Sequence, residues 1–300
     1  MKQIFVSSTM RGAVHPRRLR NMTVPVDVCI PAGDPYVDLI RTFCARRGWP
    51  CRVIERWVVD AIELPMCPPF TETESLRPMA RGGFSLIFEA IYRDRVIVLK
   101  RIDGPAGLAH PVRYLIGAQE AKILPAIRSP WIVPVLGTGV TGTAIWIAME
   151  RMQTTLHHVL PHLSPSEVWR VLADACRGLA DLHAYGWVHM DVKPQNIFLC
   201  NGRGRIGDLS SVWRRDVYLP MRIRTVTTQY ADPVLTRPEH RFLRATPDLD
   251  VYAIGMILHE YATARKLSHT AAMRLANRCM GTDRPDAQHL AAMLEAMAQC

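Results

Sequence analysis

The hydrophobic pattern of this chain changes once from a strand-type to a helix-type period, and that change constrains the fold more than any other feature. Residues 76–100 contain two short runs rich in β-branched and aromatic residues, GFSLIFEAIY and RVIVLK, with a turn at Arg93–Arg95 between them. From Ser164 onward, apolar residues recur at helical spacing. A strand-rich unit followed by a helical unit predicts an α+β fold of two lobes with a cleft between them.

Two segments carry the start signals of buried helices. In SPSEVWRVLADACRGLADLHAYG, Ser164 can cap the helix, Pro165 takes the first helical position and Glu167 completes a capping box. Gly186 can end that helix in the left-handed conformation. In TPDLDVYAIGMILHEYAT, the Thr-Pro pair at 246–247 repeats the same start, and this helix is apolar enough to be buried.

The first part of the chain has a different character. The first 26 residues carry several basic residues and no acid, so HPRRLR fits a nuclear address, an anion-binding arm or a solvated disordered terminus. DPYVDLIRTFCARRG, residues 34–48, predicts a helix that Gly48 ends, and a second helix is predicted from Val53 to Ile62. LPMCPPF at 64–70 indicates a linker. We expect this region to pack on the main domain rather than to act as a separate module.

Composition limits the classes of protein that the chain can represent. The formal net charge is +10 and the pI is about 9.5, which favours phosphate-bearing or acidic partners. No apolar run reaches the length of a membrane span, and the start of the sequence lacks the pattern of a secretory signal. The eight cysteines form no CxxC pair, which favours reduced thiols in the cytosol or nucleus over disulfides or zinc.

Polar residues at fixed offsets follow the first helix, in VHMDVKPQNIFL at 188–199. Asp191 could accept the proton of an attacking hydroxyl, Lys193 could neutralise a transferred phosphoryl group, and Asn196 could hold a hard metal ion. The same residues could instead form a polar turn, in which Asp and Asn bond to their own backbone. The stretch alone leaves both interpretations open.

Other residues gain meaning only in combination. Asp208 in RIGDLSSV follows a short strand-type run, Lys100 ends VIVLK, and Glu120 in RYLIGAQEAKIL could pair with Lys100. Taken singly, Asp208 fits a turn residue, Lys100 fits a lysine with its amine in solvent, and Glu120 fits an exposed helical glutamate. Gly82 and Gly83 in ARGGFSLIFEA would let backbone amides approach phosphate oxygens, although two adjacent glycines also fit a plain hairpin.

Taken in this order, the motifs resemble the eukaryotic-type serine/threonine protein kinase family over about residues 75–290. HMDVKPQN resembles the catalytic loop, DLS stands in the place of the DFG motif, and Asp250 of DLDVYAIG resembles the residue that braces the catalytic loop. The resemblance implies ATP and Mg²⁺. The catalytic residues that it implies are Asp191, Lys193, Lys100 and Glu120, and the implied metal ligands are Asn196 and Asp208.

The resemblance extends to the nucleotide site. ARGGFSLI resembles the glycine-rich loop, with Ala80 and Ser85 standing where two of its glycines usually are. IAMERM resembles the hinge, with Met149 as the gatekeeper. Val98 replaces a small residue over the adenine and would narrow that pocket. The residues implied to bind ATP are Ala80, Arg81, Gly82, Gly83, Phe84, Ser85, Ile87, Val98, Lys100, Met149, Glu150 and Met152.

The resemblance also implies the domain organisation. It predicts an N-terminal extension at 1–74 and a bilobal protein kinase domain at 75–300. The β-rich N-lobe would cover about 75–150, and the helical, partly trimmed C-lobe about 151–300. Lys193, together with Thr227 three residues before Tyr230, matches the serine/threonine branch, so the expected partners are protein substrates.

Departures from the family pattern carry their own expectations. Met190 replaces the arginine that normally pairs with a phosphorylated activation loop, so we expect activity without that phosphate. Ser210 replaces a glycine and leaves the metal ligand intact. Val234 replaces the glutamate that pairs with the late arginine, so Arg284 is expected to lack its usual partner, with Glu239 as a candidate substitute.

Few residues separate Glu260 from Arg284, which predicts that the helices after the buried helix are trimmed. This trimming and the altered DFG and APE motifs resemble herpesvirus-encoded serine/threonine kinases. That subgroup would imply viral and host protein substrates and an intracellular site, the host nucleus or alternatively the cytoplasm. A divergent cellular kinase is the competing interpretation.

Two other functions remain open. A pseudokinase scaffold fits the altered glycine loop, DLS in place of DFG and DPV at 232–234 in place of APE. All six polar positions of the catalytic machinery are nevertheless present. A nucleic-acid-binding protein would use the basic surface, but the basic residues are scattered without aromatic interleaving, which disfavours it. The arginines at 214, 215, 222 and 224 either favour acidic or phosphorylated substrates or form a solvated loop face.

Overall fold

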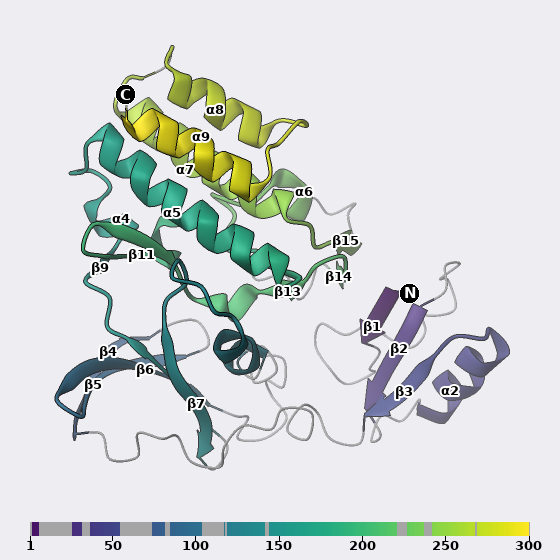
Figure 1. The fold of residues 1–300 in the computed structure, drawn as a ribbon. Coiled ribbons are helices and arrows are strands. Elements are labelled where there is room, and N and C mark those ends of the chain that lie inside the picture. The colour runs from purple at the N-terminus through teal and green to yellow at the C-terminus, as the bar shows by residue number, and fades with distance from the viewer. Residues whose placement is uncertain are drawn as a thin grey trace.

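The computed structural model confirms the predicted α+β arrangement, with a sheet-rich lobe followed by a helical lobe (Figure 1). The structure describes residues 2–5, 26–31, 37–54, 74–81, 85–103, 117, 119–141, 144–220, 227–236, 242–267 and 269–299.

The first lobe is a five-stranded antiparallel sheet in the order β4-β5-β6-β8-β7. The turn predicted between the two strand-type runs is present, since Arg93 and Asp94 join β5 to β6 with positive φ angles of 48° and 59°. Such left-handed pairs match the twist of a tight hairpin. The strands are β4 (Glu74–Arg81), β5 (Leu86–Tyr92), β6 (Arg95–Asp103), β7 (Val135–Thr141) and β8 (Ala144–Glu150).

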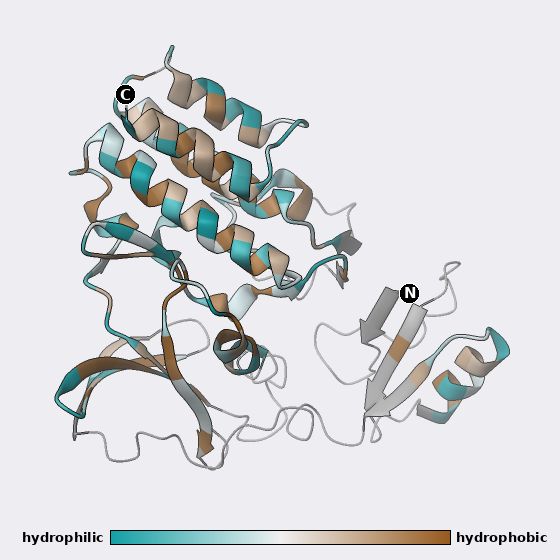
Figure 2. Cartoon of the chain, viewed as in Figure 1, coloured by the Kyte–Doolittle hydropathy of each residue, from teal (hydrophilic) through white to brown (hydrophobic). Residues whose placement is uncertain are grey.

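The second lobe is built around long helices that share one core. The predicted capping box of α5 is present: Glu167 N–H donates to the Ser164 hydroxyl, and Ser164 N–H donates to the Glu167 carboxylate. Gly186 follows this helix with a φ of +81°, as expected for its stop. Figure 2 shows that α5 carries both hydrophobic and hydrophilic residues along its length, as an amphipathic helix should. The helices are α4 (Leu156–Val159), α5 (Pro165–Ala184), α6 (Pro233–Thr236), α7 (Asp248–Ala264), α8 (Ala271–Met280) and α9 (Ala287–Gln299).

The second predicted helix starts differently from the expectation. Helix α7 begins at Asp248 with Pro247 as its N-cap, and no side chain caps it. Instead, backbone carbonyls serve the first turn: Leu249 N–H donates to Thr246 O, and Asp250 N–H donates to Pro247 O. A side-chain cap is therefore not needed at this end. Helix α7 is largely buried, as predicted, and few residues separate it from α8.

Short strands and 3₁₀ turns position the loops between the long helices. Strand β11 pairs antiparallel with both β12 and β9, β10 pairs with β13, and β14 pairs with β15. The Ile206 carbonyl accepts from Val133 N–H (2.8 Å), so the end of β12 is tied to the chain leading into the sheet lobe. The elements are β9 (Thr154–Thr155), β10 (Trp187–Val188), β11 (Ile197–Cys200), β12 (Arg203–Ile206), β13 (Trp213–Arg214), β14 (Tyr218–Pro220), β15 (Phe242–Arg244), η2 (Leu124–Ala126), η3 (Pro194–Asn196) and η4 (Leu209–Ser211).

The N-terminal region contains a small parallel sheet of β1 (Lys2–Phe5), β2 (Val26–Pro31) and β3 (Cys51–Ile54). Helix α2 (Val37–Arg46) connects β2 to β3 and matches the first helix predicted here. The second predicted helix is wrong at its start, because Val53 and Ile54 pair with β2 as a strand. A fully disordered terminus is likewise wrong for residues 2–5. HPRRLR, residues 55–62 and the expected linker at 64–70 lie outside the described residues.

Two further observations concern the described part of the chain only. None of its helices combines the length and apolar character that a membrane crossing requires. In this part, free thiols are found at Cys44, Cys51, Cys176, Cys200 and Cys279.

Candidate active site

The carboxylate of Asp250 fixes the backbone of the loop that contains Asp191. Asp250 lies in the first turn of α7 and is 1% exposed. Its Oδ2 accepts from the backbone N–H of His189 (2.8 Å) and contacts His183 Nε2 (2.8 Å), and its Oδ1 accepts from Met190 N–H (2.8 Å). Met190 has a φ of +69°, a left-handed conformation that an unbranched non-glycine residue rarely adopts. Asp250 therefore holds a strained turn in place one residue before Asp191.

The ring of His189 connects this turn to the chain before Asp208. His189 is fully buried, and its Nε2 lies 3.1 Å from the carbonyl oxygen of Gly207. Asp191 N–H donates to Nδ1 of the same ring (3.3 Å). A carbonyl on one nitrogen and an N–H on the other require the neutral tautomer with its proton on Nε2. His189 thus connects the segment of Asp191 to the segment of Asp208.

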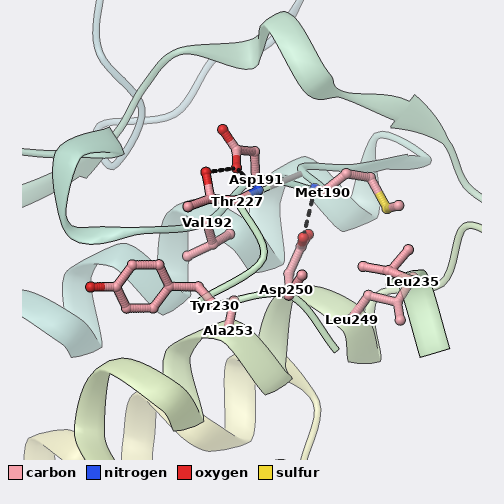
Figure 3. Close-up of a pocket in the computed structure, with 10 residues that line it drawn as sticks. Met190, Asp191, Val192, Thr227, Tyr230, Leu235, Leu249, Asp250 and Ala253 are labelled. Carbon is pink, nitrogen blue, oxygen red and sulfur yellow. Dashed lines mark hydrogen bonds between the residues drawn. The ribbon is translucent and has the colours of Figure 1, made fainter. Parts of the chain in front are cut away.

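The Asp191 carboxylate accepts hydrogen bonds from Thr227 and Lys193, and Figure 3 shows the contact with Thr227. Its Oδ1 accepts from the backbone N–H of Thr227 (2.9 Å) and from the Thr227 hydroxyl (2.8 Å). Its Oδ2 accepts from Lys193 Nζ (2.7 Å), and the same ammonium donates to the Thr227 hydroxyl (2.9 Å). The Asp191 side chain is 11% exposed, so one edge of the carboxylate still faces solvent. The structure brings together the predicted Asp191 and Lys193, and it adds Thr227 to them.

Lys100 on β6 joins two carboxylates from distant parts of the chain. Its Nζ lies 2.8 Å from both oxygens of Glu120, in the helical residues 119–123, and 2.7 Å from Oδ1 of Asp208. Burial by itself lowers the pKa of Lys100, but Asp208 and Glu120 outweigh burial and raise it, so the ammonium stays charged. The expected pair of Lys100 and Glu120 is present.

The two carboxylates respond differently to Lys100. Burial opposes ionisation of Asp208, yet Lys100 outweighs burial and brings the pKa of Asp208 below its ordinary value. At Glu120 burial prevails over Lys100 and raises the pKa. Asp208 also has a left-handed backbone with a φ of +57°. Asp208 is the more strongly anionic of the two carboxylates, and its side chain is 37% exposed, against 1% for Glu120.

Asn196 and Asp208 are chemically suited to a small divalent cation. Asn196 donates its Nδ2 to the carbonyl oxygen of Asp191 (2.9 Å), and the described residues place no donor on its amide oxygen. Asp208 contacts Lys100 through Oδ1 and is also hydrogen-bonded by the Ser210 side chain. A carboxylate has about four lone-pair sites, so these two contacts leave room for a cation. Oxygen donors in small number, with the remaining positions left to water and phosphate, are what Mg²⁺ prefers.

Most of the predicted nucleotide residues that the structure describes lie on four strands of the sheet, β4, β5, β6 and β8. Val98 pairs directly with Met149 across β6 and β8, and Ile87 pairs with Lys100 across β5 and β6. Ala80 is the partner of Ile87 on β4. The register therefore groups Ile87, Val98 and Lys100 around one region of the sheet. The rest of the predicted set includes Arg81, Ser85, Glu150 and Met152, which are described, and Gly82, Gly83 and Phe84, which lie outside the described residues.

Sequence reasoning missed Phe198 of β11, whose ring lies against Gly207, the residue before Asp208. A Cβ placed on Gly207 would lie 2.7 Å from the Phe198 ring and 2.8 Å from the Val133 side chain, so a larger residue before Asp208 would push these side chains aside. Phe198 lies in NIFL, the apolar run after the predicted catalytic loop, which gave no hint of this contact.

Met190 occupies the position of the missing arginine and is buried. It packs in what we call the apolar loop cluster, formed by Val188, Met190, Leu235, Ala245 and Leu249 with Trp213, Ala231 and Val234 packed against them. Met190 is 5% exposed. The cluster joins the catalytic loop, β13, the segment around α6 and the start of α7. Apolar contacts thus connect these segments at the point where the family usually places a cation.

A hydrogen bond ties the helical residues 119–123 to the chain after Asp208. Gln119, next to Glu120, donates its Nε2 to the carbonyl oxygen of Val212 (2.7 Å). Val212 follows η4 and precedes Trp213 of the apolar loop cluster. The position of Glu120 is therefore linked to this segment by an uncharged contact.

Arg284 lacks its usual partner at position 234, as expected, but it pairs with two other carboxylates. Its Nη2 lies 2.6 Å from Oδ2 of Asp232, and its Nη1 lies 3.3 Å from Oδ2 of Asp248. The guanidinium also lies 5.0 Å from the centre of the Tyr252 ring. The carboxylate has moved two residues toward the N-terminus, from position 234 to Asp232, and Val234 packs against the apolar loop cluster instead. Glu239, the expected substitute, lies outside the described residues.

The chain resembles known proteins over most of its length. A family model described as the protein kinase domain matches residues 73–288. The serine/threonine-protein kinase PknB of Mycobacterium leprae is 30% identical over 205 residues, covering 61% of this chain and 31% of that protein. The serine/threonine-protein kinase PknL of Mycobacterium bovis is 28% identical over 218 residues, covering 70% and 54%.

A plant relative shows a similar degree of likeness. The Wee1-like protein kinase of Oryza sativa subsp. japonica is 25% identical over 209 residues, covering 66% of this chain and 37% of that protein. The chain spans less than two thirds of the length of each of these three relatives.

Replacing Lys100 with methionine should make stability depend on pH. Without the ammonium, burial and the nearby Asp208 raise the folded-state pKa of Glu120 further above its unfolded value. Such a group stabilises the fold below its unfolded pKa, and this contribution is lost as pH rises through the folded pKa. The thermal midpoint of Lys100→Met should therefore rise, relative to the unchanged chain, as pH is lowered from about 8 to about 5. Parallel profiles for Lys100→Met and the exposed control Lys122→Met would contradict this account.

Replacing Asp232 with asparagine should lower the free energy of unfolding by about 3 kcal/mol, because Arg284 is then a largely buried cation without its nearest carboxylate. The side chains of Arg284 and Asp232 are 15% and 9% exposed. Urea unfolding measures the change. The matched control is Asp283→Asn, which removes a carboxylate that is 94% exposed. Equal effects of the two substitutions would show that the pair has no special role.

Proposed function

Because the chain belongs to the protein kinase family, we propose that it transfers the γ-phosphoryl group of ATP to serine or threonine hydroxyls of proteins. The observation that carries this proposal is the convergence of two groups of side chains. Lys100, Glu120 and Asp208 form one ion-paired set, and Asp191 and Lys193 form the other, with His189 spacing them. We assign the activity to residues 75–300, with the N-lobe ending near 150.

Asp191 is the proposed acceptor of the hydroxyl proton. The substrate oxygen forms a bond to the γ-phosphorus while the bond from that phosphorus to the β–γ bridging oxygen breaks, and ADP leaves. A carboxylate has about four lone-pair sites, and Thr227 and Lys193 use three of them at 2.7–2.9 Å. Asn196 Nδ2 makes a longer contact of 3.4 Å with Oδ2. A substrate hydroxyl would replace this longest contact, while the other donors keep the carboxylate oriented. Lys193 places positive charge beside the transferred group.

The nucleotide end of the site relies on charge fixed in advance. Lys100 is held in place by Glu120 and Asp208, which use all three of its N–H donors. A phosphate oxygen would replace one of these contacts at an ammonium that is already positioned and charged. Asn196 and Asp208 would hold Mg²⁺, which when bound neutralises phosphate charge. We propose that Val98 and Met149, paired across two strands, narrow the adenine pocket from one side.

We also propose that this kinase needs no activating phosphate in the segment after Asp208. Met190 is a buried member of the apolar loop cluster, and Trp213 packs against that cluster. The Gln119 side chain donates a hydrogen bond to the Val212 carbonyl oxygen. These contacts order the segment without a phosphate and its arginine partners. Thr227 is already bonded to Asp191 and Lys193, which supports an arrangement ready for catalysis.

A further proposal concerns origin and cellular site. The short connection between α7 and α8, DLS in place of DFG and DPV in place of APE resemble herpesvirus-encoded kinases. Such an enzyme would act in the host nucleus on viral and host proteins. The relatives named above come from bacteria and a plant, so this proposal rests on the features of the chain itself. Imaging a tagged full chain in animal cells tests it, and exclusion from the nucleus would argue against it.

The full chain, given radiolabelled ATP, Mg²⁺ and a mixed protein substrate, should transfer label to serine or threonine. Asp191→Asn should abolish most of that transfer and leave ATP-dependent thermal stabilisation in place, because the carboxylate acts on the hydroxyl and not on nucleotide binding. The matched control is Asp94→Asn in the exposed β5–β6 turn. If the unchanged chain is stabilised by ATP and transfers nothing, the chain is a pseudokinase scaffold and the enzyme proposal fails.

Phosphatase treatment should leave the rate of transfer intact, as should alanine at Ser210, Ser211, Thr225 or Thr228. Alanine at Thr227 is expected to lower the rate because Thr227 bonds to Asp191. Loss of activity at one of the other sites, with recovery by glutamate at the same site, would show that a phosphate is required.

Met190→Arg tests the apolar loop cluster itself. The substitution buries an unpaired guanidinium and should destabilise the chain by about 3 kcal/mol, whereas Met190→Leu should change stability by less than about 1.5 kcal/mol. Urea unfolding measures both. Equal stability of the two variants would show that this position is not an apolar contact.

A further inference from the structure

Two arginines contact one aspartate, and a third arginine lies next to them in the chain. Asp216 Oδ1 lies 2.9 Å from Arg244 Nη2, and Asp216 Oδ2 lies 3.8 Å from Arg215 Nε. Arg214 ends β13 directly before Arg215, and its guanidinium lies 5.9 Å from the Trp187 ring centre. The side chains of Arg215 and Arg244 are 52% and 55% exposed. We call Arg214, Arg215 and Arg244 the arginine cluster; Asp216 is the described carboxylate that two of its members contact.

The arginine cluster lies within reach of a peptide held at Asp191. Arg214 pairs in register with Trp187 across β13 and β10, and Trp187 precedes Asp191 by four residues. Four residues span at most about 14 Å even when fully extended. Trp213, next to Arg214, also packs with Met190 in the apolar loop cluster. An extended substrate passing over Asp191 can therefore bring its flanking residues to these guanidiniums.

The rim next to Asp191 carries mostly neutral side chains among those whose contacts are described. Gln195 follows Asp191 by four residues, and its Nε2 lies 3.2 Å from His157 Nδ1. Gln229, two residues after Thr227, contacts the exposed carboxylate of Glu260, which also accepts from the Tyr230 hydroxyl (2.9 Å). An anionic substrate would therefore meet one carboxylate on this rim and three guanidiniums in the arginine cluster.

We propose that the arginine cluster selects protein substrates that carry anionic residues within about four positions of the phosphorylated hydroxyl. The anions are carboxylates or phosphates, since both accept paired hydrogen bonds from a guanidinium. The positive net charge of the chain draws such segments toward the site from a distance. This inference rests on the proposed kinase function and adds the class of substrate to it.

Peptide binding tests the inference without requiring catalysis. Three labelled peptides share one serine and differ in the residues that flank it, which are glutamates, phosphoserines or glutamines. Fluorescence anisotropy with the full chain should give tighter binding of both anionic peptides than of the glutamine peptide. The difference should shrink as salt is raised, because exposed charges are screened. The order of the two anionic peptides identifies which anion the cluster prefers.

A matched pair of variants separates the cluster from net charge. The triple variant Arg214→Gln, Arg215→Gln, Arg244→Gln should weaken binding of the anionic peptides by about tenfold, as three exposed ion pairs would. The control variant Arg170→Gln, Arg274→Gln, Arg278→Gln removes the same charge from α5 and α8 and should leave the preference intact. Thermal midpoints establish that both variants fold, and Arg214→Gln alone, with a smaller loss, stands in if the triple variant does not.

The outcomes distinguish this inference from the proposed function. Equal binding of the three peptides overturns the inference, as do equal losses in the two triple variants, whether or not the chain transfers phosphate. Preferential binding of anionic peptides by a chain that transfers no phosphate would support the binding site and overturn the proposed function. When transfer is observed, kcat/KM for the three peptides should follow their order of binding.

Discussion

The buried carboxylate of Asp250 is the interaction on which the active-site geometry depends. It accepts backbone hydrogen bonds from His189 and Met190 and thereby holds Met190 at a positive φ that the residue would not adopt by itself. Because the next residue is Asp191, any relaxation of that turn would move the proposed catalytic carboxylate. Asp250 lies in the first turn of α7, and most residues of this helix are buried in the core of the second lobe. The position of the loop is therefore tied to that core.

Around the loop that contains Asp191, the charged side chains and the apolar side chains have different roles. The charged groups that the proposed reaction needs are paired in advance, as Lys100 with Glu120 and Asp208, and Lys193 with Asp191. The groups that only have to order the chain are apolar or neutral, as in the apolar loop cluster and the Gln119 contact. Met190 takes the place where the family usually has a cation, and it packs in the apolar loop cluster apart from the paired charged groups.

The errors made from sequence have identifiable physical causes. The helix predicted from Val53 failed because apolar spacing in a short segment fits a strand equally well, and pairing with β2 decided between the two. The missing partner of Arg284 was sought at the position of the family motif and then further along the chain. A carboxylate two residues earlier, at Asp232 just before α6, pairs with the same guanidinium in the segment between α8 and α9. A linear motif cannot describe such an exchange.

The sequence by itself determined the class of fold, the caps of α5 and the identity of the residues that meet in the proposed active site, because hydrophobic period and motif order are local properties of the chain. Only the tertiary structure decided which of those residues touch. It joined Lys100 to Asp208 across 108 positions, Thr227 to Asp191 across 36, and Asp232 before α6 to Arg284 before α9. The reason is physical: hydrogen bonds and ion pairs act over a few ångströms, and distances of that size between remote segments exist only once the core has packed.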